Sequence, residues 1–141
     1  MSAQPYKAVV RYAGDSMFLG TPPSGHTQVI DVKGDRSNGI TPLEMLLVSV
    51  AACTAADVIS ILEKKRQVVT EYRVEIEADR REEFPRIFTA FRINHIVHGH
   101  GVLEKALADA IELSDTKYCS VAGMVRLAAT ITTSYEIIEV E

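Results

Sequence analysis

The feature that most constrains this chain is an apolar helix signal that begins at residues 41–44, TPLE. Thr41 can accept a hydrogen bond from a free amide of the first turn, Pro42 suits the first helical position, and Glu44 can reach back to the amide of Thr41. Over residues 45–56 the side chains are apolar or small on every side. Because such a helix must be covered all round, we expect it in the middle of the protein or in an oligomer interface.

Charge and hydropathy exclude several classes of protein. The apolar run covers only residues 45–56, whereas about 20 residues are needed to cross a bilayer, so we expect no membrane partner. Lys and Arg number 15 against 19 Asp and Glu, and this net charge of −4 argues against a nucleic-acid partner. The first residues lack a basic region followed by an apolar stretch, so we expect no export signal and a cytoplasmic location.

Alternating and β-branched segments predict the strands. Residues 6–12 and 27–32 flank a Gly/Pro/Ser loop at 20–25, and whether residues 17–19 form a further strand stays open. Apolar and charged side chains alternate over residues 72–78. The pattern resumes after a turn near Pro85, which favours an antiparallel pair.

The second half of the chain predicts two more helices and a last strand. Helical periodicity returns over residues 103–112, Ser114-Asp115-Thr116 is expected to break it, and a short helix over 120–126 leads to a strand over 131–137. This order favours an α+β fold, with antiparallel sheets packed around the long buried central helix. At 141 residues we expect one domain, 1–141.

The only two cysteines, Cys53 and Cys119, are the candidate reactive groups. Neither has a second Cys or a His within four residues, so local spacing predicts no zinc site. Cys53 lies among alanines on the apolar helix, and it is either a packed core thiol or a thiol with room for a partner. Cys119 follows Lys117 near an expected helix start, which favours the thiolate and makes it look the more reactive; a packed thiol is the alternative.

With these residues in view, the chain resembles the OsmC/Ohr family (osmotically inducible protein C and organic hydroperoxide resistance protein), closest to its OsmC-like branch. The resemblance lies in residues 41–55 and in residues 113–121, each with one cysteine, and it extends over nearly the whole chain. It implies an intertwined homodimer with the two long helices packed at its centre. It also implies one two-cysteine site per subunit near the dimer interface.

The resemblance further implies reduction of organic hydroperoxides. By position, Cys53 would be the attacking cysteine and Cys119 the resolving one. An external dithiol would reduce the resulting disulfide, and no cofactor or metal is required.

Burial among alanines raises the pKa of a thiol, so the resemblance also implies a cation beside Cys53. In the family an arginine before the helix, held by a glutamate at the helix start, has this role. Here the candidates are Arg36 and Glu44, with Arg11 as an alternative cation. Glu44 falls one position after the usual glutamate, which matches Leu43, and the capping box already explains it.

Three histidines, His95, His98 and His100, raise the question of a metal site. On a strand His98 and His100 share a face, while His95 points to the other, so the three cannot converge without a bend at Gly99. We therefore expect a solvent-facing strand end.

Two other functions stay open. The chain could be a non-enzymatic protein that binds an apolar small molecule at the dimer interface, given the small residues around Cys53. It could also be a thiol redox sensor that uses the same cysteines on another electrophile.

Overall fold

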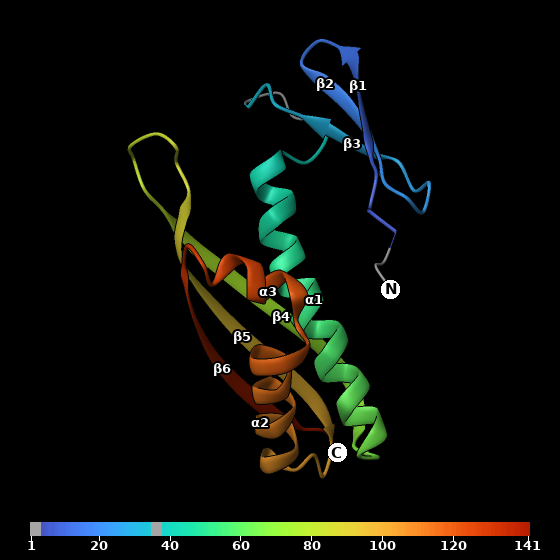
Figure 1. Ribbon diagram of the computed structural model, residues 1–141. Helices are drawn as coiled ribbons and strands as arrows, with labels where there is room; N and C mark the ends of the chain where they lie inside the picture. Colours follow the sequence, from blue (N-terminus) through green and yellow to red (C-terminus); the bar gives the residue numbers. More distant parts are fainter. Residues whose placement is uncertain (1–3, 35–37) are drawn as a thin grey trace. The chain divides into compact units, whose positions relative to one another are not determined.

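The structure is a computed structural model that describes residues 4–34 and 38–141 (Figure 1). The chain divides into two compact units, an N-terminal unit, Met1–Leu46, and a C-terminal unit, Leu47–Glu141. Each unit has its own three-stranded sheet. The expected α+β class is confirmed.

The N-terminal unit is an antiparallel sheet in the order β1-β2-β3. Its strands are β1 (Val9–Gly14), β2 (Met17–Thr21) and β3 (Gln28–Asp31). The strand that the sequence left open is therefore present as β2. The turn before it has positive φ at Asp15 (50°) and Ser16 (66°), the conformation that a tight hairpin requires.

Helix α1 (Pro42–Lys64) begins where the sequence predicts. The amide of Thr41 donates to Glu44 Oε1 at 2.9 Å, and the amide of Glu44 donates to Thr41 Oγ1 at 3.2 Å. These two bonds are the predicted capping box, in which each residue satisfies a free amide of the other. The helix is thereby fixed in register from its first turn, which decides the direction of every later side chain on it.

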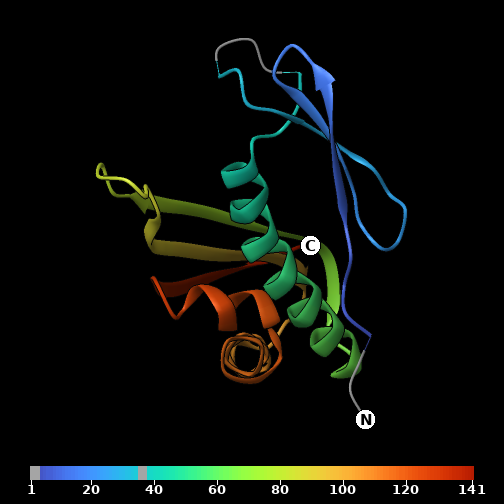
Figure 2. The ribbon, with the colours of Figure 1, turned by 45° about the horizontal axis from the view of Figure 1, so that its top comes forward.

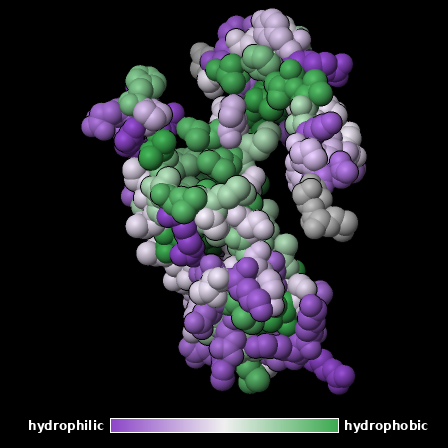
Figure 3. Space-filling view, in the orientation of Figure 1, coloured by the Kyte–Doolittle hydropathy of each residue, from purple (hydrophilic) through white to green (hydrophobic). Residues whose placement is uncertain are grey.

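Within one chain α1 is buried on one side only. Its buried residues recur every fourth position, at Val50, Thr54, Val58 and Leu62. Other apolar side chains on the helix are open, and Val48 is 55% exposed. Figure 3 shows hydrophobic side chains gathered on the surface over the first half of α1 and over α3, whereas the surface over α2 is mostly hydrophilic. The expectation of a helix covered all round is therefore not met by one chain alone.

By length and composition, α1 could cross a membrane, since an 18-residue window of it has a mean hydropathy of 2.2. This window is longer than residues 45–56, the uncharged run on which the sequence-based expectation of no membrane partner rests. Core helices of soluble proteins meet the same criterion.

The sheet of the C-terminal unit has the order β4-β5-β6. As predicted, β4 (Val68–Arg80) and β5 (Phe88–His100) are antiparallel. Strand β6 (Thr130–Glu139) instead runs parallel to β5, so this sheet is mixed and not wholly antiparallel. The parallel pairing is possible because a long helical crossover connects β5 to β6.

Three helical elements form this crossover: α2 (Glu104–Leu113), the π-helical turn η1 (Ser114–Tyr118) and α3 (Ser120–Val125). The predicted helix break at Ser114 is therefore a widened turn that continues the helical path. Helices α1, α2 and α3 lie on one face of the sheet (Figures 1 and 2). The main core cluster lies between α1, α2 and β5, and includes Val58, Leu62, Val97, Leu107 and Ile111.

Candidate functional site

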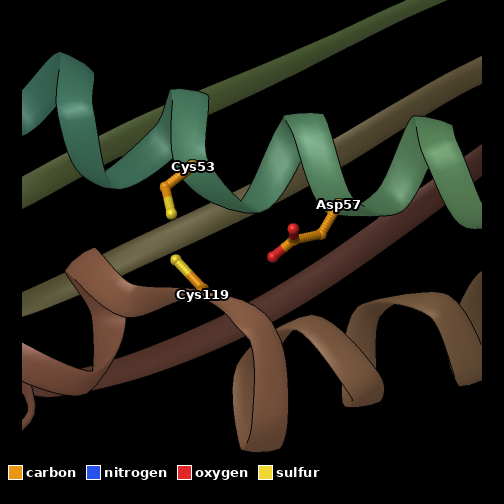
Figure 4. Close-up of side chains that lie close together, drawn as sticks. All are labelled: Cys53, Asp57 and Cys119. Carbon is orange, nitrogen blue, oxygen red and sulfur yellow. The ribbon is translucent and has the colours of Figure 1, made fainter. Parts of the chain in front are cut away.

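The structure brings the two cysteines together with an aspartate. Cys53 and Asp57 lie on α1, Cys119 lies between η1 and α3, and all three belong to the C-terminal unit. The two sulfurs and a carboxylate oxygen of Asp57 lie within 4.8 Å of one another. Figure 4 shows the two thiols pointing toward each other and the carboxylate pointing toward the same space. Both thiols are free.

The backbone explains why these side chains converge. Cys53 and Asp57 are four residues apart on a helix, so they occupy one face. Cys119 is brought to that face by η1, whose wide turn closes with a bond from the Cys119 amide to the Ser114 carbonyl at 2.9 Å. Wide helical turns of this kind are frequent at functional sites. Cys119 also caps α3, because its Sγ accepts from the Ala122 amide at 3.3 Å.

Ser114 fixes the aspartate. Its hydroxyl donates to Asp57 Oδ2 at 2.9 Å and lies 3.0 Å from Thr54 Oγ1, whose own hydroxyl can donate to it. Ser114 is fully buried and Thr54 is 1% exposed. Because buried hydroxyls without partners are costly, this chain of bonds holds the Asp57 carboxylate in one orientation.

The Cys119 thiol is held in its protonated form. Burial raises its pKa to about 11, hydrogen bonding to Cys53 and the Asp57 charge act in the same direction, and the Ala122 amide opposes them. The sequence-based view that Cys119 is the more reactive thiol is therefore wrong. The short helix supplies one amide, which does not compensate for the burial of a side chain that is only 5% exposed.

The structure describes two of the predicted activating groups, Arg11 and Glu44, and both belong to the N-terminal unit. Arg36 lies outside the described residues, so its role stays a prediction. Arg11 lies exposed on β1 of the N-terminal unit. Glu44 is engaged with Thr41 in the capping box. In the described part of the chain, no cation contributes to the pKa of Cys119.

The three histidines lie on β5 at different depths. The expected solvent-facing position is wrong for His95, which is fully buried on β5, whereas His98 is half-buried and His100 is exposed. His95 Nδ1 lies 2.7 Å from the Tyr72 hydroxyl, and its Nε2 is the one buried side-chain polar atom without a partner in the described ranges 4–34 and 38–141. Burial lowers the pKa of His95 to about 4 and raises that of Tyr72.

Asp57 also reaches the surface of the C-terminal unit. It lines a pocket of about 320 Å³. Besides Asp57, the lining consists of Ser60, Ile61, Lys64, Leu113 and Tyr118. The pocket gives small solutes a route from solvent to the aspartate beside the two thiols.

Sequence reasoning missed Asp57 and Ser114. A signal for Asp57 was present, since it is the first charged residue after the apolar run and lies one helical turn beyond Cys53. Ser114 carried no such signal, because its contact with α1 depends on how α2 packs. The argument against zinc considered only neighbours along the chain, whereas the Cys53, Asp57 and Cys119 cluster is assembled from distant segments.

Comparison with known proteins gives consistent similarities. A family profile described as OsmC-like protein matches residues 33–134. Protein YhfA from Escherichia coli strain K12 is 42% identical over 133 residues, which cover 94% of this chain and 98% of YhfA. The sequence similarity thus extends over nearly the full length of both proteins.

Solved structures agree in fold. The crystal structure of a hypothetical protein from Aquifex aeolicus VF5 is 32% identical with a TM-score of 0.87, covering 99% of this chain and 100% of that one. The structure of an organic hydroperoxide resistance protein from Elizabethkingia anophelis matches with a TM-score of 0.68 at 12% identity, covering 96% of this chain and 97% of that one. At this lower identity the likeness concerns the fold alone.

Proposed function

Because the chain belongs to the OsmC family, we propose that it is a thiol-dependent peroxidase that reduces organic hydroperoxides through Cys53 and a Cys53–Cys119 disulfide. Family membership supports a redox role connected with peroxides. One observation carries the finer proposal: two cysteines 66 residues apart meet within 4.8 Å beside a carboxylate. A disulfide needs a sulfur–sulfur distance of about 2 Å, so small side-chain movements are enough to form it.

The different surroundings of the two thiols assign their roles. Cys119 is buried and protonated near neutral pH, because burial raises its pKa to about 11. A thiol is a weak nucleophile and a thiolate a strong one, so Cys119 is unsuited to the first attack. Cys53 is only half-buried and is therefore the better placed of the two to meet a peroxide.

The first step forms a sulfenic acid. The Cys53 thiolate attacks the outer peroxide oxygen, the O–O bond breaks, and the alkoxide leaves as an alcohol after taking up a proton. Cys53 then carries S–OH, and the peroxide has gained the two electrons that the sulfur lost. A cation beside Cys53 would favour its thiolate, and Arg36 remains our candidate for that cation.

The second step forms the disulfide. Cys119 attacks the sulfenic sulfur, the S–S bond forms, and the hydroxyl leaves as water with the Cys119 proton. The Asp57 carboxylate lies within 4.8 Å of both sulfurs and is held by Ser114, so it is placed to accept that proton and pass it on. An external dithiol restores both thiols by exchange.

The exposed face of α1 supports a homodimer. An apolar helix with Val48 at 55% exposure is unfavourable in water, and a second copy of the same helix would cover it. Such an assembly would place the two-cysteine site near the subunit interface. We further propose that the protein acts in the cytoplasm, where thiols are kept reduced.

Peroxide consumption tests the proposal. Reduced protein should consume cumene hydroperoxide with an excess dithiol, and Cys53→Ser should abolish the reaction. Cys119→Ser should still give one sulfenic acid per chain, trapped by dimedone and weighed by mass spectrometry, but no intramolecular disulfide. Ser120→Ala is the matched control, since Ser120 is exposed beside Cys119.

Undiminished turnover by Cys53→Ser would reject the mechanism. Absence of turnover in the wild type, together with an apolar molecule that co-purifies with it, would favour the ligand-binding alternative.

A further inference from the structure

We propose that the reduced site is also a zinc site, formed by Cys53 Sγ, Cys119 Sγ and a carboxylate oxygen of Asp57, and that disulfide formation releases the metal. This goes beyond peroxide reduction, because the same side chains would bind a metal ion as well as react with a peroxide. The binding itself does not depend on peroxidase activity.

The donor set fits zinc by chemistry. Zinc binds Cys sulfur at about 2.3 Å and carboxylate oxygen at about 2.0 to 2.2 Å, so its ligand atoms lie about 3.5 to 3.8 Å apart in a tetrahedral site. The three atoms here lie within 4.8 Å of one another, so closing the site needs movements of about 1 Å. Thiolates select zinc over magnesium and calcium, which prefer oxygen ligands.

The surrounding hydrogen bonds match what metal ligands need. The carboxylate is oriented by the Ser114 hydroxyl at 2.9 Å, and the Cys119 sulfur accepts from the Ala122 amide at 3.3 Å. Such outer partners fix ligand orientation and raise affinity. Both are already formed, so the protein has little ordering to do when a metal binds.

A divalent cation also balances the charge of this donor set. Two cysteine sulfurs and a carboxylate oxygen lie within 4.8 Å of one another, and binding of zinc displaces the thiol protons and compensates the negative charge of the ligands.

The site also has an entrance and an open coordination position. Asp57 lines the pocket of about 320 Å³ on the surface of the C-terminal unit, so a hydrated ion can reach the carboxylate first. Three protein ligands leave a fourth position for water, an arrangement that zinc accepts.

Metal and disulfide exclude each other. When an oxidant such as diamide takes two electrons from the two thiolates, the S–S bond forms, the reduced diamide takes up two protons, and zinc leaves as the dication. The competition between zinc and a hydroperoxide rests on the proposed function. Zinc would hold both sulfurs, and it would protect the reduced pair until it is removed.

Cobalt titration of the reduced, full-length protein tests the site. We expect one Co²⁺ per chain, with a thiolate-to-metal charge-transfer band and the visible bands of a four-coordinate ion. Zn²⁺ should displace the cobalt, and a chelating dye should report the zinc affinity. Diamide should release one zinc ion per chain, as the free thiol count falls by two.

Variants identify the ligands. Asp57→Asn should weaken zinc at least tenfold, and Ser114→Ala about tenfold, because metal ligands and their outer partners carry effects of this size. Cys119→Ser should remove most of the charge-transfer band. Asp109→Asn is the matched control, since Asp109 is a carboxylate paired with Lys105 away from the cysteines, and its variant should bind like the wild type.

Failure to bind cobalt in the reduced, folded wild type would overturn the zinc site. An Asp57→Asn variant with unchanged spectrum and affinity would also overturn it, because Asp57 would then not be the third ligand of the metal. Peroxide turnover without metal binding rejects only the zinc site. Metal binding without turnover rejects only the peroxidase.

Discussion

The C-terminal unit contains two polar clusters, one half-buried and one more deeply buried. The cysteine cluster contains Cys53, Cys119 and Asp57, which can exchange protons or share a cation. The histidine cluster contains His95 and Tyr72, joined at 2.7 Å and both neutral, because burial lowers the pKa of His95 to about 4 and raises that of Tyr72.

The difference teaches that burial alone does not make a polar group functional. At the histidine cluster, burial removes charge and leaves one nitrogen, His95 Nε2, unpaired within the described residues. At the cysteine cluster, three ionisable groups face one another and one of them lines a surface pocket. Only the second arrangement gives a reactant access and a partner for its proton.

The largest contrast should appear in stability. His95→Ala leaves a cavity under β5 at a fully buried position, so we expect the free energy of unfolding to fall by about 3 kcal/mol. Cys53→Ser, at a half-buried position, should change it by less than about 1 kcal/mol. Urea unfolding measures both. Equal losses in the two variants would show that the cysteine cluster is as structural as the histidine one.

The next contrast is in pH dependence. In the folded state the pKa of His95 is about 4, below its ordinary value of 6.5, so unfolding takes up a proton between these values. Its stabilising effect is complete above pH 6.5 and is lost as the pH falls towards 4. We expect the free energy of unfolding to be about 2 kcal/mol lower at pH 5 than at pH 7.5 from this group.

His95→Gln is the variant for this measurement, because it removes the ionisable ring and keeps a polar side chain. Urea unfolding at pH 7.5 and at pH 5 gives the acid-induced loss of stability in each protein. This loss should be about 2 kcal/mol smaller in His95→Gln than in the wild type. An unchanged acid slope in His95→Gln would assign the loss to other groups.

The smallest effect concerns proton transfer within the cysteine cluster. If Asp57 accepts the Cys119 proton, Asp57→Asn should slow disulfide formation about tenfold, or about 1.4 kcal/mol in the barrier. The sulfenic acid should form at the wild-type rate. Stopped-flow measurement of both phases after mixing with cumene hydroperoxide separates them, and an unchanged second phase would remove Asp57 from the mechanism.

Local rules predicted the elements well. The capping box at Thr41 and Glu44 and the antiparallel β4–β5 pair follow from neighbouring residues, and the structure has both. The parallel partner of β5 was missed, because alternation along a strand does not state which strand lies beside it. His95 could have been placed in the core, since it shares the odd-numbered face of β5 with the buried Phe91, Ile93 and Val97.

The candidate site was predictable in its cysteines and not in its surroundings. The two cysteines were candidates from the sequence alone, but their pairing came from resemblance, since nothing local says that residues so far apart meet. Asp57 was detectable from its position four residues after Cys53. Ser114 depends on the path between α2 and α3, which propensity does not define.

The path from α2 through η1 to α3 makes the site sensitive to the number of residues in this segment. Ser114 contacts Asp57, Cys119 contacts Cys53, and the five residues of η1 keep both in phase with α1. Adding one residue to this already widened turn, with ordinary helical spacing beyond it, would rotate Cys119 and everything after it by roughly 100°. Insertions between Ser114 and Cys119 should therefore be tolerated less well than most substitutions there, even at exposed positions such as Lys117.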